Sequence, residues 1–178
     1  MRARDRLHEL LQAFSFHLFA KRPVEPVLSL GDFRVTVMRR LVLAALQVRF
    51  NVGARQAPLF QFVEFNLLDS PREACAVCSL DLTADAAQWR TAVATAVREI
   101  RRLGSYGLSD AELKRYSVAL LSDSAQLAAM DDRIAHNEQL QQLMEAVACA
   151  HTFMAPVTAQ SATEAVRRVL LSRGFSRI

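Results

Sequence analysis

Glycine and proline are scarce in this sequence, and long uninterrupted apolar runs are missing. Five glycines and five prolines among 178 residues exclude collagen-like and low-complexity structure. No run reaches the roughly 18 uncharged apolar residues of a membrane-spanning helix, because Arg39, Arg40 and Arg49 interrupt the longest ones. The start of the chain also lacks the pattern of a secretory signal. We therefore expect a soluble protein with no membrane partner.

Several catalytic motifs are also absent. Neither H-E-x-x-H nor its inversion H-x-x-E-H occurs, and both G-x-S-x-G and a glycine-rich phosphate loop are missing. The four histidines are His8, His17, His136 and His151, and the nearest approach to such a motif is His136 with Glu138. Positions two apart point to different faces of a helix. The sequence thus predicts no catalytic residue, no metal site and no cofactor within this chain.

The three cysteines, Cys75, Cys78 and Cys149, are an odd number in a chain long enough to fold without disulfides. This usage indicates a reducing compartment. The C-x-x-C spacing of Cys75 and Cys78 falls in an alternating, strand-like segment, where positions three apart point to opposite faces. We expect two ordinary strand residues, with Cys78 in the core, instead of a metal or redox pair.

The charge balance gives little support for nucleic-acid binding. Lysine and arginine total 22 against 18 acidic residues, for a net charge of +4. The basic residues are scattered or lie near helix ends, and no aromatic residues alternate with them as platforms for bases. We expect no nucleic-acid partner. At 178 residues, 52% of them hydrophobic, the chain has room for one domain with its own core.

Hydrophobic periodicity predicts three strands, at about 13–21, 60–68 and 74–83. The first is ambiguous, since the opening twenty residues also fit helical spacing. The turn-rich segment 69–73 makes the other two an antiparallel hairpin with one buried face. The second-strand and third-strand residues expected on that face are Val63, Phe65, Leu67, Ala76, Cys78, Leu80 and Leu82.

The rest of the sequence has helical patterning. One helix is expected from Gly31 to about Asn51 and another from Trp89 to a stop at Gly104. Two sequences fit capping boxes at the starts of further helices, Ser109 with Glu112 and Ser161 with Glu164. The apolar stripes expected to face the core are Val35, Met38, Val42, Ala45 and Leu46; Leu113, Tyr116, Leu120, Leu127 and Met130; and Leu140, Leu143, Met144, Val147 and His151.

These elements predict an α+β fold in which an antiparallel sheet packs against several long helices, as a single domain over residues 1–178. Two polar features have alternative interpretations. The pair Asp131 and Asp132 fits a paired-carboxylate site, but at a helix end a solvated face is the simpler interpretation. His151, on an apolar stripe, is interpreted as a hydrogen-bonded histidine in the core or at its boundary.

Eight short strings, spread over most of the chain, carry a family resemblance. The strings are 8–15, 31–34, 48–51, 72–75, 92–103, 112–116, 119–124 and 127–131. In the same order and at near-matching spacing over residues 8–154, they resemble the carboxy-terminal, non-catalytic half of the pitrilysin/insulinase class of zinc metallopeptidases. No single string is diagnostic, and the resemblance rests on their collinearity. The segment 155–178 diverges from the class.

The resemblance implies a domain, incomplete in this chain, of a chambered endopeptidase that processes transit peptides of precursors imported into the chloroplast stroma. The implied partners are an extended peptide substrate and the catalytic half of the same peptidase, which would hold the zinc. The chain is then a fragment, a truncated gene product or a short protein of its own. A second interpretation is an inactive peptide-binding or chaperone-like module with the same fold.

The resemblance also implies one substrate-binding residue, Arg49. In active relatives an arginine at the end of the corresponding helix, and a tyrosine seven residues later, reach the substrate backbone. Here Arg49 occupies the arginine position, but Gln56 stands where the tyrosine would be. Arg49 is expected to donate to a peptide carbonyl or to the developing oxyanion. The alternative is an arginine that only complements the helix dipole.

Overall fold

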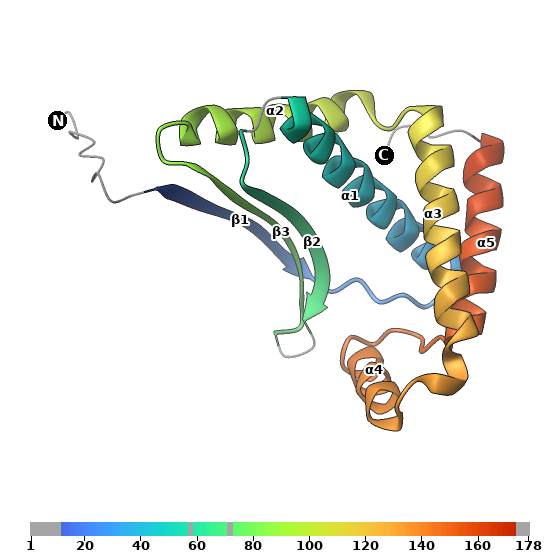
Figure 1. Ribbon diagram of the computed structural model, residues 1–178. Coiled ribbons are helices and arrows are strands. Elements are labelled where there is room, and N and C mark those ends of the chain that lie inside the picture. Colours follow the sequence, from blue (N-terminus) through green and yellow to red (C-terminus); the bar gives the residue numbers. More distant parts are fainter. Residues whose placement is uncertain (1–11, 57–58, 71–72, 174–178) are drawn as a thin grey trace.

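The computed structural model describes residues 12–56, 59–70 and 73–173. Within these ranges, three strands and five α-helices form an α+β arrangement, as the sequence predicts (Figure 1). Their order is β1 (Ala13–Pro23), α1 (Leu30–Gln56), β2 (Phe62–Ser70), β3 (Cys75–Asp85), α2 (Trp89–Tyr106), α3 (Asp110–Ala129), a short 3-10 turn η1 (Asp131–Arg133), α4 (His136–Ala148) and α5 (Pro156–Arg173).

The sheet is antiparallel with the order β1-β3-β2, so the last strand in sequence lies in the middle. Leu82 of β3 pairs with Phe16 on one side and with Val63 on the other. The expected hairpin is confirmed, although Pro71 and Arg72 of its turn lie outside the described residues. Strand alternation puts Leu82 and its even-numbered neighbours on the face that the helices cover, and Leu82 is fully buried.

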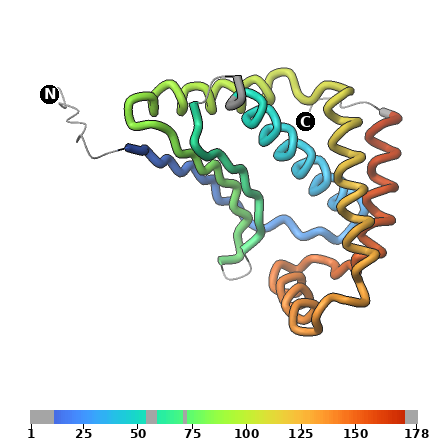
Figure 2. Tube along the Cα trace, in the orientation of Figure 1, coloured from blue at the N-terminus to red at the C-terminus, as the bar shows by residue number. Residues whose placement is uncertain are grey.

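α1 lies between the sheet and an outer pair of helices, α3 and α5 (Figure 1). Its buried stripe follows helical spacing through Phe33, Val37, Leu41 and Phe50. The tube view shows α3 and α5 running alongside each other while α2 crosses the end of the sheet (Figure 2). The core therefore contains side chains from the sheet, from α1 and from the outer helices. Its largest fully buried side chains are Leu41, Leu82, Leu113 and Leu170.

Three helix boundaries differ from the prediction, and the first is the end of α1, at Gln56 instead of about Asn51. α2 continues past Gly104 to Tyr106 and stops at Gly107, whose positive φ of 68° suits a glycine. α5 begins at Pro156, because proline fits the first turn of a helix. The expected capping box at Ser161 is wrong: its hydroxyl donates to the Val157 carbonyl inside the helix. The box at Ser109 is confirmed.

Burial also corrects four expectations. Val35 is exposed, because the buried stripe of α1 is rotated away from it. Cys78 lies on the helix-facing side of β3 but is exposed, unlike Leu80 two residues further on. The stripe on α4 is not part of the core, since this helix has no buried residue and ends before His151. The same holds for Leu127 and Met130, which are exposed.

The segment after residue 155, which diverges from the family resemblance, is integral to this fold as far as Arg173. Val166 and Leu170 of α5 are buried against the core, and α5 packs along α3 and α1. Residues 174–178 lie outside the described part of the chain. The divergent segment thus closes the outer layer of helices.

Replacing Leu170 by alanine should therefore destabilise the domain strongly. The residue is 1% exposed, and a cavity of this kind costs about 2–5 kcal/mol. Leu171→Ala is the matched control: Leu171 is 40% exposed, and we expect its loss to cost less than about 1 kcal/mol. Urea unfolding followed by circular dichroism measures both, and equal effects would show that α5 does not pack as described.

Candidate functional site

A wide groove of about 1110 Å³ lies where the second half of α1 meets the end of α2 and the start of α3. Its wall combines aromatic and aliphatic side chains with several charged ones. Two smaller cavities, of about 340 and 380 Å³, lie elsewhere among the described residues. The lining residues that carry polar groups are Arg49, Thr95, Glu99, Arg102, Tyr106, Ser109, Glu112, Arg115 and Tyr116.

Arg49 projects from α1 into this groove and is held by Glu112 of α3. Its Nε donates to Glu112 Oε1 and its Nη2 donates to Glu112 Oε2, both at 2.8 Å. Nη2 also donates to the Gly107 carbonyl at 3.3 Å. Both side chains are about four-fifths buried, at 22% and 21% exposed. Such a bidentate pair fixes the plane of the guanidinium.

The position of Arg49 in its helix differs from the expectation. α1 continues to Gln56, so Arg49 lies seven residues before the last residue of the helix and not at its end. The dipole of a helix terminus acts only within the last turn. Complementing the dipole therefore does not account for Arg49. The side chain of Gln56 lies outside the described part of the structure.

Glu112 has two tasks, of which the sequence analysis identified one. As the third residue of the α3 capping box, it accepts from the backbone N–H of Ser109 at 2.9 Å. Its second task, the pairing with Arg49, joins positions 63 residues apart and had no local signal. The hydrogen bond from Arg49, supported by those from Ser109, lowers the pKa of Glu112 to about 2 against the opposing effect of burial. The same pair raises the pKa of Arg49.

Three further side chains in the groove were not singled out from the sequence. Tyr106 is 83% exposed at the end of α2, directly before the glycine that accepts from Arg49. Arg102 is mostly exposed, and its contact with Glu99 is long, at 3.9 Å. Arg115 lines the groove from α3. For this part of the groove, the signal in the sequence was a tyrosine directly before a glycine, Tyr106 and Gly107.

His151 belongs to a separate polar cluster that links three parts of the chain. Its Nδ1 accepts from the backbone N–H of Val27 at 3.0 Å, so Nδ1 is unprotonated there and Nε2 carries the proton toward Asp69 Oδ2, also at 3.0 Å. The N–H of Thr152 donates to the Val27 carbonyl. This network fastens the segment after α4 to β2 and to the segment before α1, which agrees with a boundary histidine.

The remaining candidate residues stay apart. His17 contacts Asp81 across the exposed face of the sheet at 2.6 Å, His136 opens α4, and His8 lies outside the described residues. The cysteines are free, with Cys75 half-buried. Within the described ranges, no three histidine, cysteine, aspartate or glutamate side chains come together in a way that could hold a metal ion. No helix in those ranges is long and apolar enough to cross a membrane.

Solved structures define the class to which this fold belongs. A predicted insulinase family protease from Yersinia pestis superimposes with a TM-score of 0.70 over 91% of this chain and 37% of its own, at 16% identity. The periplasmic protease PqqL from Escherichia coli matches with a TM-score of 0.63 over 91% of this chain and 17% of its own, at 14% identity. The domain has the fold of insulinase-family proteases.

Sequence similarity points to a particular peptidase. The chain is homologous to a segment of the chloroplastic stromal processing peptidase, with 44% identity to the Arabidopsis thaliana protein and 43% to the Pisum sativum protein, over 148 residues in both cases. The alignment covers 83% of this chain and 12% of each relative, so the chain spans about an eighth of their length. No family model matches the sequence. The resemblance to this class is confirmed.

The Arg49–Glu112 pair makes the stability of this domain depend on pH in the acid range. A carboxyl whose pKa falls from 4.5 to about 2 on folding stabilises the fold above pH 4.5 and loses that contribution as the pH falls toward 2. We expect a loss of about 2 kcal/mol for this partly exposed pair, below the full equivalent of the shift because solvent screens it.

Glu112→Gln isolates this effect, because glutamine retains the capping box but carries no charge. The variant should unfold more easily at pH 7, by about 1–2 kcal/mol, and the difference from the wild type should shrink as the pH falls from 5 to 2. Glu138→Gln, on the exposed surface of α4, serves as the control. A difference that does not change with pH would contradict the role assigned to the pair. Urea unfolding across this pH range provides the measurement.

Proposed function

We propose that this chain is a non-catalytic domain of a zinc metalloendopeptidase that removes transit peptides from precursor proteins in the chloroplast stroma. The observation that carries the proposal is the 44% identity to stromal processing peptidase over 83% of the chain. The insulinase-family fold supports it independently. The proposed partners are an extended transit peptide and the catalytic part of the same peptidase.

The zinc ion belongs to the catalytic part under this proposal. When bound, zinc activates a water molecule for peptide hydrolysis. The described residues of this chain do not fit a zinc site, because no three potential ligands converge. The contribution proposed for this chain is thus limited to binding and positioning the peptide.

Arg49 is proposed as the residue that holds the peptide backbone. Nε and Nη2 of Arg49 both donate to the Glu112 carboxylate, and Nη2 also donates to the Gly107 carbonyl. Among the described residues, Nη1 has no hydrogen-bond partner, which leaves two N–H donors for a ligand in the groove. The pair is neutral as a whole, so it acts as an oriented donor more than as a cation. A peptide carbonyl is the acceptor that fits.

A chimeric peptidase tests this proposal. The matching 148-residue segment of the Arabidopsis stromal processing peptidase is replaced by this chain, and cleavage of a transit-peptide precursor is followed. We expect the chimera to cleave, and the isolated chain to cleave nothing and retain no zinc after dialysis. A chimera that is folded but inactive, while the chain still binds peptide, would instead support an inactive peptide-binding module.

If the arginine donates where charge develops on the scissile carbonyl, Arg49→Ala should lower kcat/KM of the chimera. The expected loss of transition-state stabilisation is about 2–4 kcal/mol. Arg49→Lys should restore little, since an ammonium cannot reproduce the planar fork. Arg101→Ala, on the exposed surface of α2, is the control. Normal turnover with a lower melting temperature would reduce Arg49 to a structural link between α1 and α3.

A further inference from the structure

Two arginines in the groove around Arg49 keep their donors unused. Arg102 of α2 and Arg115 of α3 both line the groove, and both are exposed. Arg102 Nη1 lies 3.9 Å from Glu99 Oε1, which is too far for a hydrogen bond. Arg115 makes no hydrogen bond or ion pair with any of the described residues. The groove thus holds guanidinium groups that are available to a ligand.

Helical spacing directs both arginines toward the same opening. On α2, Arg102 lies four residues before Tyr106, and both line the groove. On α3, Arg115 lies three residues after Glu112, and both line the groove as well. Residues three or four apart share one face of a helix. The groove therefore has a cationic group on each of two walls, with Gly107 between the two helices.

The charges in the groove leave an excess of positive charge. Glu112 has a pKa of about 2 and is ionised at neutral pH, so it neutralises Arg49. Glu99 is the other glutamate that lines the groove, and it stands against both Arg102 and Arg115. Low-dielectric walls concentrate such a field, and aromatic and aliphatic side chains form much of this groove. The groove therefore attracts an anionic group.

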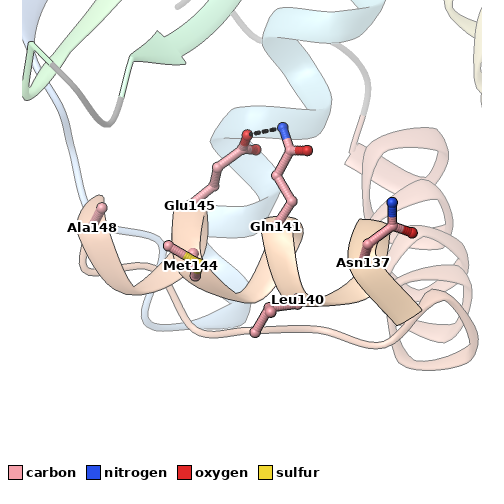
Figure 3. A pocket seen from close by; sticks show the side chains of 6 residues that line it. All are labelled: Asn137, Leu140, Gln141, Met144, Glu145 and Ala148. Carbon is pink, nitrogen blue, oxygen red and sulfur yellow. Dashed lines mark hydrogen bonds between the residues drawn. The ribbon is translucent and has the colours of Figure 1, made fainter. Parts of the chain in front are cut away.

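The two smaller cavities have the opposite sign. On the wall of the cavity along α4, the charged residue is Glu145, whose carboxylate accepts from Gln141 Nε2 at 3.0 Å (Figure 3). On the wall of the cavity between α1 and β2, it is Glu64. Neither lining includes a lysine or an arginine. Of these three cavities in the described part of the chain, the one that suits an anion is the groove around Arg49.

We propose that Arg102 and Arg115 form a subsite for a carboxylate group of the peptide bound in the groove. A guanidinium presents paired N–H donors that match the two oxygens of a carboxylate. Arg49 is left for a neutral backbone carbonyl, because Glu112 already balances its charge. The assignment rests on the proposed function, since that function places a peptide in the groove.

Two parts of a peptide carry a carboxylate, the C-terminus and the acidic side chains. Transit peptides are rich in arginine and poor in acidic residues, so an intact one brings few carboxylates to the groove. Hydrolysis of a peptide bond leaves a new carboxylate at the end of the released segment. The subsite is therefore expected to favour a C-terminus, or an acidic side chain of the precursor, over an arginine-rich stretch.

Three peptides that differ in their carboxylates test the subsite on the 178-residue chain without any cleavage. Each has about ten residues of alanine, leucine and serine and an acetylated N-terminus. The first ends in a free carboxylate, the second in an amide, and the third in an amide with glutamate in place of a central serine. We expect the first to bind at least about fivefold more tightly than the second in isothermal titration calorimetry. The difference should shrink as sodium chloride is added.

The glutamate peptide distinguishes the two sources of the carboxylate. An affinity equal to that of the carboxylate-ended peptide means that the subsite accepts either source. An affinity equal to that of the amide peptide restricts the subsite to a C-terminus. Both results support a carboxylate subsite when the first peptide binds more tightly than the second.

A double variant locates the subsite. Arg102→Gln with Arg115→Gln should lower the affinity for the carboxylate-ended peptide to that for the amide peptide, and should leave the latter unchanged. Arg101→Gln with Lys114→Gln is the matched control, because it removes the same charge from neighbouring exposed positions of α2 and α3 that do not line the groove. The control should retain the preference for the carboxylate. Circular dichroism should show intact helix content in both variants, because all four side chains are exposed.

Four results would overturn the subsite: no binding by any of the peptides, equal affinity for the carboxylate-ended and amide peptides, a preference that survives in the Arg102 and Arg115 variant, or an equal loss in the control. Displacement of the carboxylate-ended peptide by an equal concentration of inorganic phosphate would also overturn it, by showing a general anion site. An inactive chimera counts against the proposed function. A chimera that cleaves, while the peptides bind equally, counts against the subsite alone.

Discussion

The ion pair between Arg49 and Glu112 is the interaction on which the groove depends. It joins the central helix to the start of α3 across a separation of 63 residues, and it also engages the turn between α2 and α3 through the Gly107 carbonyl. Three walls of the groove are therefore fixed by one guanidinium. Because Glu112 also caps α3, the same carboxylate sets where that helix begins and where Arg49 points.

Local patterns in the sequence predict much of this fold and little of its assembly. The hairpin of β2 and β3 and the capping box at Ser109 depend on neighbouring residues, and both were predicted correctly. The exposure of Cys78 depends instead on how far the helices extend over the sheet, which alternation along a strand does not determine. The start of α5 at Pro156 was missed because Ser161 and Glu164 have the spacing of a capping box. Both residues in fact lie inside the longer helix.

The candidate site shows the same division. The resemblance selected Arg49, and the structure places it in the groove. Its partner Glu112 and the exposed Tyr106 come from segments that only the tertiary fold brings near. On α4, the apolar stripe was identified correctly from its period, but periodicity cannot distinguish a stripe that faces the core from one that faces a partner.

The strand order also has a consequence for how the chain folds. Among the described strands β1 is made first, yet it pairs with β3 alone, and about 50 to 70 residues separate the paired positions. The β2–β3 hairpin closes a short loop and can form as soon as both strands exist. During synthesis, β1 and the apolar stripe of α1 must therefore wait for β3 to leave the ribosome. The early chain exposes an unpaired strand for that interval, a state in which chaperones protect many proteins from aggregation.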